Sequence, residues 1–193
     1  MNVSRLLLLT VIVPASLLFA GQASAEEYLF QHEHVLGTSL ELRVHASSAE
    51  LAEQAENAAL KEIDRLAKIL SRHDPASELM QWQSSTKQRS VSQDLLTVLT
   101  RAEKWRRLTG GAFDVRAGAF VELWKQSAQA QQLPAEEQRR QIAVTLATAP
   151  WNIDAAGAIQ RNDKLAISLD ALGKGYILDA VCRKIQTDCP GVT

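Results

Sequence analysis

A lysine flanked by two glycines stands near the end of the chain, where an apolar segment gives way to a helical pattern. Residues 165–169 have the pattern of a short strand, and Gly173-Lys174-Gly175 follows. A strand that leads into a helix through glycines directs free backbone N–H groups and the positive end of the helix dipole at one point, where Lys174 adds a full charge. The segment is therefore a candidate phosphate site. Its spacing is that of neither a P-loop nor a dinucleotide-binding loop, so a solvated lysine at a turn remains the alternative.

A second candidate begins where Gly110-Gly111 ends a helix. The small residues there would let a flat ligand lie against the backbone, and Asp114 can accept hydrogen bonds from ribose hydroxyls or from backbone donors. A glycine helix end followed by a buried Phe113 is the alternative. That alternative explains the glycines but not Asp114, Gly118 and Trp124 together.

Other groupings of reactive side chains carry less weight. His32 and His34 would share one face of a strand and could hold a metal, but no third ligand is evident, so a surface pair is favoured. No Ser/His/Asp or Cys/His arrangement has local support. The tryptophans each lie in or beside an apolar stripe, which favours core positions; they are Trp82, Trp105, Trp124 and Trp151.

The elements that must position these residues begin with two strands. Residues 28–35 predict the first strand and residues 38–46 the second, because apolar and polar residues alternate in the latter. Gly37 between them indicates a bulge or a close approach to the backbone. A helix follows, with Ser47 and Glu50 as its capping box and Pro75 beyond its end. Its expected core stripe is Ala52, Ala55, Ala59, Ile63, Leu66 and Leu70.

The rest of the chain alternates helices with short strands. Ser77 restarts a short helix, Ser92 caps a longer one, and Pro134 opens another at its first position, after an exposed polar connection over 126–132. Residues 151–154, 158–161 and 165–169 read as strands, with Asn162-Asp163 as the hairpin turn between the last two. The expected fold is α+β, with a mixed or antiparallel sheet and packed helices.

The first residues predict a secretory signal over 1–25. Arg5 supplies the positive charge, residues 6–19 are apolar, and Ala23-Ser24-Ala25 is a cleavage site. No cysteine lies near that site, which argues against a lipid anchor. The mature chain, 26–193, would then be one domain.

The charge balance and the cysteines limit the partners. The chain has 21 basic and 22 acidic side chains and no basic block, which argues against nucleic acid or an anionic membrane surface. Cys182 and Cys189 could pair in an oxidising compartment. The equal alternative is a buried Cys182 on the apolar face of a helix and a free Cys189.

Four blocks, in order along the chain, resemble the FAD:protein FMN transferase family (the ApbE family). Leu36-Gly37-Thr38 resembles its M-G-T, and residues 70–79 resemble L-S-x-Y-x-x-x-S-E-[IL], with His73 in place of Tyr. Residues 109–124 resemble T-G-G-A-F-D-P-T-V-G-P-L-V-N-L-W, the most specific match. Residues 168–179 resemble D-L-G-G-I-A-K-G-Y-A-V-D, with Ser168 in place of the first Asp.

The resemblance implies a periplasmic enzyme that uses FAD and Mg²⁺. Such enzymes split the FAD pyrophosphate and join FMN, through a phosphoester, to a Thr or Ser of a target flavoprotein in a membrane redox complex. Lys174 would then hold an FAD phosphate, and Ala171 would offer its carbonyl to Mg²⁺. The remaining residues that the resemblance assigns to the flavin nucleotide site are Leu36, His73, Ala112, Phe113, Asp114 and Ser168.

The family's domain continues beyond the final helix, where it carries further Mg²⁺ ligands and a catalytic His. We therefore expect this chain to be a copy truncated at the C-terminus, for which the sequence names no general base. Two other functions stay open. One is a periplasmic protein that binds or hydrolyses FAD without modifying a target, and the other is a secreted α+β interaction module without flavin.

Overall fold

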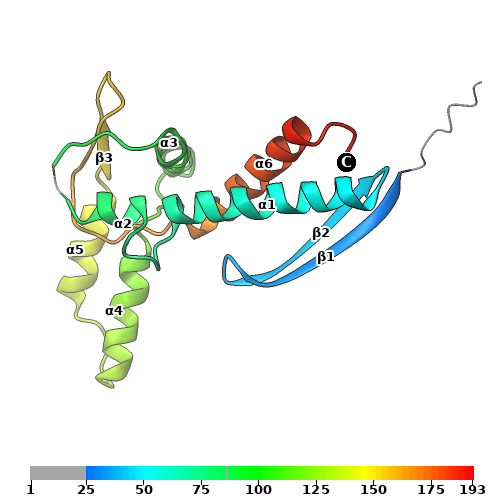
Figure 1. Cartoon of the computed structure of the whole chain (residues 1–193). Coiled ribbons are helices and arrows are strands. Elements are labelled where there is room, and N and C mark those ends of the chain that lie inside the picture. Colours follow the sequence, from blue (N-terminus) through cyan, green and yellow to red (C-terminus); the bar gives the residue numbers. More distant parts are fainter. Residues whose placement is uncertain (1–24, 86) are drawn as a thin grey trace, which may run out of the picture.

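One long helix, α1 (Ala49–Leu70), is the central element of the molecule (Figure 1). The structure is a computed structural model that describes residues 25–85 and 87–193, so the expected signal over 1–25 lies almost wholly outside the described residues. An antiparallel hairpin, β1 (Glu26–Val35) and β2 (Thr38–Ala46), packs against one side of α1. Helix α6 (Asp170–Asp188) packs against another side.

The remaining elements gather around the C-terminal end of α1 (Figure 1). They are α2 (Glu78–Gln83), α3 (Gln93–Leu108), α4 (Gly118–Gln129), α5 (Glu136–Leu146), β3 (Trp151–Ile153) and β4 (Ile159–Arg161). Strands β3 and β4 form a second antiparallel hairpin, separate from the first. The expected α+β class is confirmed, with two small antiparallel sheets among the described residues. No helix in the described part of the chain is long and apolar enough to cross a membrane.

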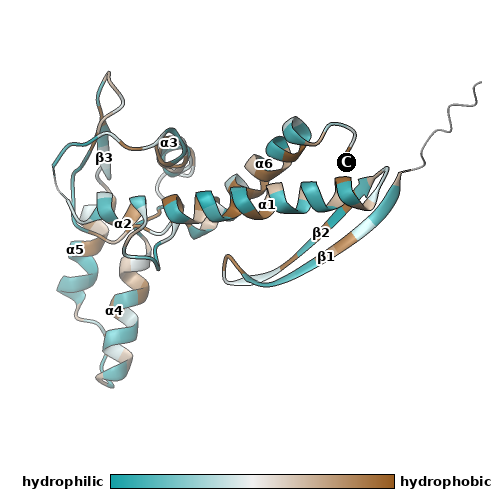
Figure 2. Ribbon diagram, viewed as in Figure 1, coloured by the Kyte–Doolittle hydropathy of each residue, from teal (hydrophilic) through white to brown (hydrophobic). Residues whose placement is uncertain are grey.

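The sequence of α1 explains its central place. Its apolar residues recur at three- and four-residue steps, and all of the expected stripe, from Ala52 to Leu70, is buried. Figure 2 shows apolar bands along α1 and an apolar part of α6 beside it. The N-cap is Ser48, whose hydroxyl accepts from the backbone N–H of Leu51 at 3.3 Å, so the expected cap at Ser47 is wrong by one residue.

The expected strand over 165–169 is wrong, and so is the turn at Asn162-Asp163. This segment has an irregular backbone, and a side chain takes the place of a strand partner. The amide of Gln83 donates to the carbonyl of Ile167 at 3.3 Å and accepts from its N–H at 2.7 Å. The β3–β4 turn lies earlier, at 154–158, where Asp154 accepts from the N–H groups of Ala156 and Ala158.

Two expectations about α4 and α5 are wrong. Part of the polar segment 126–132 belongs to α4, and Pro134 precedes the N-cap Ala135 of α5 instead of opening the helix. Trp82 and Trp151 are buried, as expected, and their rings meet edge to face at 5.8 Å.

Trp105 and Trp124, however, are 50% and 49% exposed, so the core positions expected for them are wrong. Neither cysteine forms a disulfide, so Cys189 is free as the alternative expected, whereas Cys182 is exposed and its expected burial is wrong.

Candidate functional site

A cleft of about 750 Å³ lies between the β1–β2 turn, the C-terminal end of α1 and the first turns of α6. We call it the hairpin cleft. Three of the residues expected in a nucleotide site line it together: Leu36, His73 and Lys174. They come from three segments that are distant in the sequence, so the fold gathers them. A cleft of this volume is within the range of small-molecule sites in proteins.

Leu36 is held in an unusual backbone conformation. Leu36 and Gly37 form the two-residue β1–β2 turn with φ angles of 51° and 75°. Positive φ at both positions fits a type I′ turn, which matches the twist of the flanking strands. Glycine adopts this conformation without cost, whereas a leucine is strained by about 1 kcal/mol. Strained backbone conformations are often found at functional sites, and Leu36 lines the hairpin cleft.

Two serines build the loop that carries His73. Ser71 Oγ accepts from the N–H groups of His73 and Asp74, and Ser77 Oγ donates to the carbonyl of Ser71 at 2.5 Å. Ser77 also caps α2, and Glu78 accepts from the N–H of Ser92. The serines and the glutamate of this block therefore have structural roles, while the imidazole of His73 is exposed at the cleft.

The lysine segment belongs to the helix and does not precede it. Helix α6 starts at Asp170, so Gly173, Lys174 and Gly175 lie within its first two turns. The expected strand-to-helix joint through glycines is therefore wrong. A Cβ placed on Gly173 would have no neighbouring heavy atom within 4 Å, which leaves open space beside Lys174 in the hairpin cleft.

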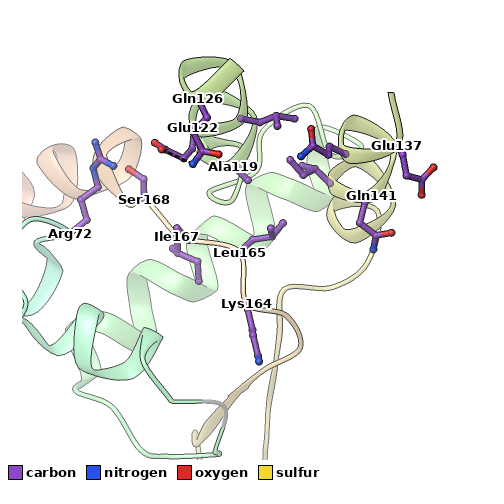
Figure 3. A pocket seen from close by; sticks show the side chains of 15 residues that line it. Arg72, Ala119, Glu122, Gln126, Glu137, Gln141, Lys164, Leu165, Ile167 and Ser168 are labelled. Carbon is purple, nitrogen blue, oxygen red and sulfur yellow. Dashed lines mark hydrogen bonds between the residues drawn. The ribbon is translucent and has the colours of Figure 1, made fainter. Parts of the chain in front are cut away.

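A second cleft, of about 730 Å³, lies beside the first; we call it the helical cleft. It is formed by α4, α5 and the segment 164–168, and Ser168 lines it (Figure 3). Glu122 and Gln126 of α4 lie on the side of the cleft near Ser168, as Figure 3 shows. Arg72 lines both clefts. The two hollows therefore share one cationic side chain.

The segment that follows Gly110-Gly111 contacts Ser168 through Val115. The N–H of Ser168 donates to the carbonyl of Val115 at 2.9 Å, which joins this segment to the start of α6. Ala112 is exposed and Phe113 is half-buried. Neither of these two, nor Asp114, lines either cleft.

Asp114 is committed to a buried ion pair. Its side chain is 2% exposed and that of Arg116 is 0% exposed, and their Oδ2 and Nη2 atoms lie 2.7 Å apart. Arg116 also binds Asp163 at 2.7 Å. Further acceptors for its guanidinium are the carbonyls of Thr145, Leu146 and Thr148. Burial lowers the pKa of Arg116, but the hydrogen bonds and charges of Asp114 and Asp163 outweigh it and raise this pKa above its ordinary value. A contact between Asp114 and a nucleotide stays a prediction.

The expected metal ligand, Ala171, is exposed in the first turn of α6. Among residues 25–85 and 87–193, no group of three or more His, Cys, Asp or Glu side chains is arranged to hold a metal ion. His32 instead pairs with Glu56 at 2.8 Å. The described side chains therefore do not form a complete Mg²⁺ site, and the carbonyl of Ala171 stays a predicted ligand.

Tyr176 fixes the helix that presents Lys174. Its hydroxyl donates to Asp94 Oδ1 at 2.6 Å, and Arg65 donates to Asp94 Oδ2 at 2.7 Å. Burial and the hydrogen bond to Asp94 raise the pKa of Tyr176 to about 12. Burial alone would raise the pKa of Asp94, but the bonds from Arg65 and Tyr176 lower it below its ordinary value. Helices α1, α3 and α6 thus meet at this carboxylate.

The sequence interpretation did not single out Arg72, Gln83 or Arg116. Arg72 stands at a variable position of the second block, so the resemblance gave no reason to choose it. Arg116 follows Asp114 by two residues, and this closeness of opposite charges could have indicated an ion pair between them. The partners of Gln83 lie 84 positions away, which no local pattern indicates.

The family model for the ApbE family matches residues 36–189. The flavin transferase ApbE from Vibrio cholerae has a similar structure, with a TM-score of 0.69 at 20% identity, covering 84% of this chain and 54% of that one. The ApbE protein from Thermotoga maritima gives 0.71 at 21% identity, with 87% and 55% covered. The flavinyl transferase ApbE from Pseudomonas stutzeri gives 0.70 at 16% identity, with 85% and 56% covered.

These similarities define the class of fold, an ApbE-type α+β domain. The family match extends over most of the chain, and the chain belongs to the ApbE family. It spans little more than half the length of these solved structures. No curated protein matches it.

Proposed function

We propose that this chain is the FAD-binding portion of an FAD:protein FMN transferase. The observation that carries the proposal is the hairpin cleft, in which Leu36, His73 and Lys174 come together from three separate segments. The resemblance assigns each of these residues to the flavin nucleotide site. Family membership and the fold of the flavin transferases support the same function.

Each of these residues has a physical part in the proposed binding. Leu36 offers an apolar surface to the flavin nucleotide, and the ring of His73 can stack and hydrogen-bond. The ammonium of Lys174 neutralises phosphate charge. The transfer breaks the bond between the FMN phosphorus and the bridging oxygen, which leaves with AMP. It forms a bond from that phosphorus to the hydroxyl oxygen of a Thr or Ser, whose proton is released to solvent. Mg²⁺, when bound, supplies further neutralisation of the phosphates.

Two incubations test the function. In the first, the chain is incubated with FAD and Mg²⁺, and the flavin fluorescence retained after gel filtration is measured; no retained flavin would contradict the proposal and favour the interaction module. In the second, a Thr-containing acceptor peptide is added. AMP release with flavin on the peptide supports the transferase, while AMP and free FMN support FAD hydrolysis. Heat-unfolded protein is the control for both.

The compartment and the partners belong to the same proposal. The leader-like residues 1–25 favour export to the periplasm, where target flavoprotein subunits of membrane redox complexes would be modified. Fractionation of cells that express the full chain tests this: recovery of the protein without residues 1–25 in the periplasmic fraction is expected. Recovery of the uncleaved chain in the cytoplasm would contradict it.

A further inference from the structure

Arg72 forms the common wall of the two clefts. It lines the hairpin cleft together with Lys174, and the helical cleft together with Ser168 (Figure 3). The residue follows the end of α1 directly, beyond the C-cap Ser71. Arg72 is the residue that the two linings have in common.

The present partner of Arg72 is a solvent-accessible carboxylate. Arg72 Nε lies 2.8 Å from Asp170 Oδ2, and the two side chains are 47% and 56% exposed. An ion pair as exposed as this contributes at most about 1 kcal/mol. A guanidinium binds phosphate through two parallel hydrogen bonds, which are stronger and better oriented than a single contact to one carboxylate oxygen. A phosphate group can therefore replace Asp170 at little cost.

Two cations and two carboxylates line the hairpin cleft, so an anionic ligand gains most when a cation is released from its carboxylate. Its ionisable side chains are His34, Asp64, Arg72, His73, Asp170 and Lys174. Among the described residues, no carboxylate lies within ion-pair distance of the Lys174 ammonium. Movement of Arg72 from Asp170 to a phosphate would give the cleft two cations that act on one anionic group.

We propose that Arg72 selects a nucleotide by its phosphate: it exchanges Asp170 for a phosphate of FAD, with Lys174 as the second cation. This inference rests on the proposed function, because it assumes that FAD binds in the hairpin cleft. It adds a residue that the family resemblance does not assign. The side chain of Asp170 turns to solvent in the bound state and acts as a competitor of the ligand.

The test compares the affinities for FAD and riboflavin, measured by flavin fluorescence at one salt concentration with Mg²⁺ present. Riboflavin shares the flavin ring and lacks every phosphate. The variants are Arg72→Ala, Arg72→Lys and Asp170→Asn. Arg43→Ala is the matched control, because Arg43 is also an exposed arginine paired with a carboxylate and does not line the cleft.

The phosphate contact predicts a specific pattern. Arg72→Ala should weaken FAD binding about 10- to 100-fold, the ratio expected for charge-assisted hydrogen bonds, and should leave riboflavin binding unchanged. Arg72→Lys should recover part of the loss. Asp170→Asn should strengthen FAD binding by up to about fivefold, because the competing ion pair is worth at most about 1 kcal/mol. Arg43→Ala should change neither affinity.

Three results would overturn the inference while the proposed function stands. These are FAD binding that is unchanged in Arg72→Ala, equal losses for FAD and riboflavin in that variant, or a loss of FAD binding in Asp170→Asn. A chain that retains no FAD at all would overturn the proposed function, and this inference with it. Thermal unfolding of each variant shows that the compared proteins are folded.

Discussion

The hydroxyl of Tyr176 and the carboxylate of Asp94 meet at 2.6 Å, although they are 82 positions apart in the sequence. This contact ties the first turns of α6, which carry Lys174, to the N-terminal turn of α3. The guanidinium of Arg101 lies 5.4 Å from the centre of the Tyr176 ring and covers it. Removal of the hydroxyl therefore tests whether this anchor supports the site.

Tyr176→Phe should lower the free energy of unfolding by about 1–2 kcal/mol, because a half-buried Asp94 loses one donor and keeps the one from Arg65. The measurement is urea unfolding followed by circular dichroism. Thr100→Ala is a control on α3, since its hydroxyl donates to the carbonyl of Leu96 within the same helix. Equal stability of Tyr176→Phe and the wild type would show that the contact is not an anchor.

The same tyrosine predicts a dependence on alkaline pH. Its pKa of about 12 in the folded chain lies above the unfolded value of about 10, so the folded state holds the phenolic proton more tightly. The stabilisation is complete below the unfolded pKa and is lost as the pH rises from about 10 through 12.

The chain has 2 tyrosines, so ultraviolet absorbance of a Tyr28→Phe variant follows Tyr176 alone. Ionisation near the ordinary tyrosine value in that folded variant would contradict the assignment.

Arg116→Ala should be among the most damaging single changes. It leaves the buried carboxylate of Asp114 and the partly buried carboxylate of Asp163 without their shared cation, at a cost of about 3–5 kcal/mol. Chemical unfolding measures the loss. Arg140→Ala, which breaks a pair whose side chains are 71% and 70% exposed, should change stability by no more than about 0.5 kcal/mol. Similar losses of unfolding free energy in both variants would show that the buried pair stabilises the fold no more than an exposed pair does.

Lys174→Ala should separate binding from stability. The side chain is exposed and lines the hairpin cleft, so its removal should leave the thermal midpoint unchanged and weaken FAD binding by about tenfold or more. Lys68→Ala, at an exposed position in the last turn of α1, is the matched control. Unchanged FAD binding in both variants would show that Lys174 does not contribute to binding.

Leu36→Gly should stabilise the hairpin and impair the site. Glycine relieves the positive φ of 51° and recovers about 1 kcal/mol, but the apolar contact expected for the flavin nucleotide disappears. Thermal unfolding and retained flavin fluorescence should therefore change in opposite directions. Parallel changes in the two measurements would show that this strain has no link to binding.

Local patterns predicted the elements whose hydrogen bonds are local. The alternation over 38–46 gave strand β2 with its observed bounds, and the three- and four-residue steps gave the buried face of α1. The segment 165–169 has the same apolar character, but Gln83 and Val115 supply its backbone partners from distant positions. A periodicity cannot show that a side-chain amide will replace a neighbouring strand.

The candidate site was predictable to the extent that the resemblance named its residues. Leu36, His73 and Lys174 were expected, and the structure brings them together in one cleft. The carboxylate of Asp114 shows the limit, because its chemistry suits ribose hydroxyls and a buried arginine equally well. Only the folded positions of Arg116 and Asp163 show that the arginine is its partner.

The backbone contact of Thr193 affects which parts of the molecule unfold together. Thr193 exchanges both backbone hydrogen bonds with His45, at 2.7 and 3.1 Å. The segment that follows α6 is therefore bonded to the edge of β2. Near the start of α6, Tyr176 is bonded to Asp94 of α3, so both ends of this helix are held by contacts to other elements. Amide protons of the first hairpin and of α6 should then exchange with solvent as one cooperative block, despite lying at opposite ends of the sequence.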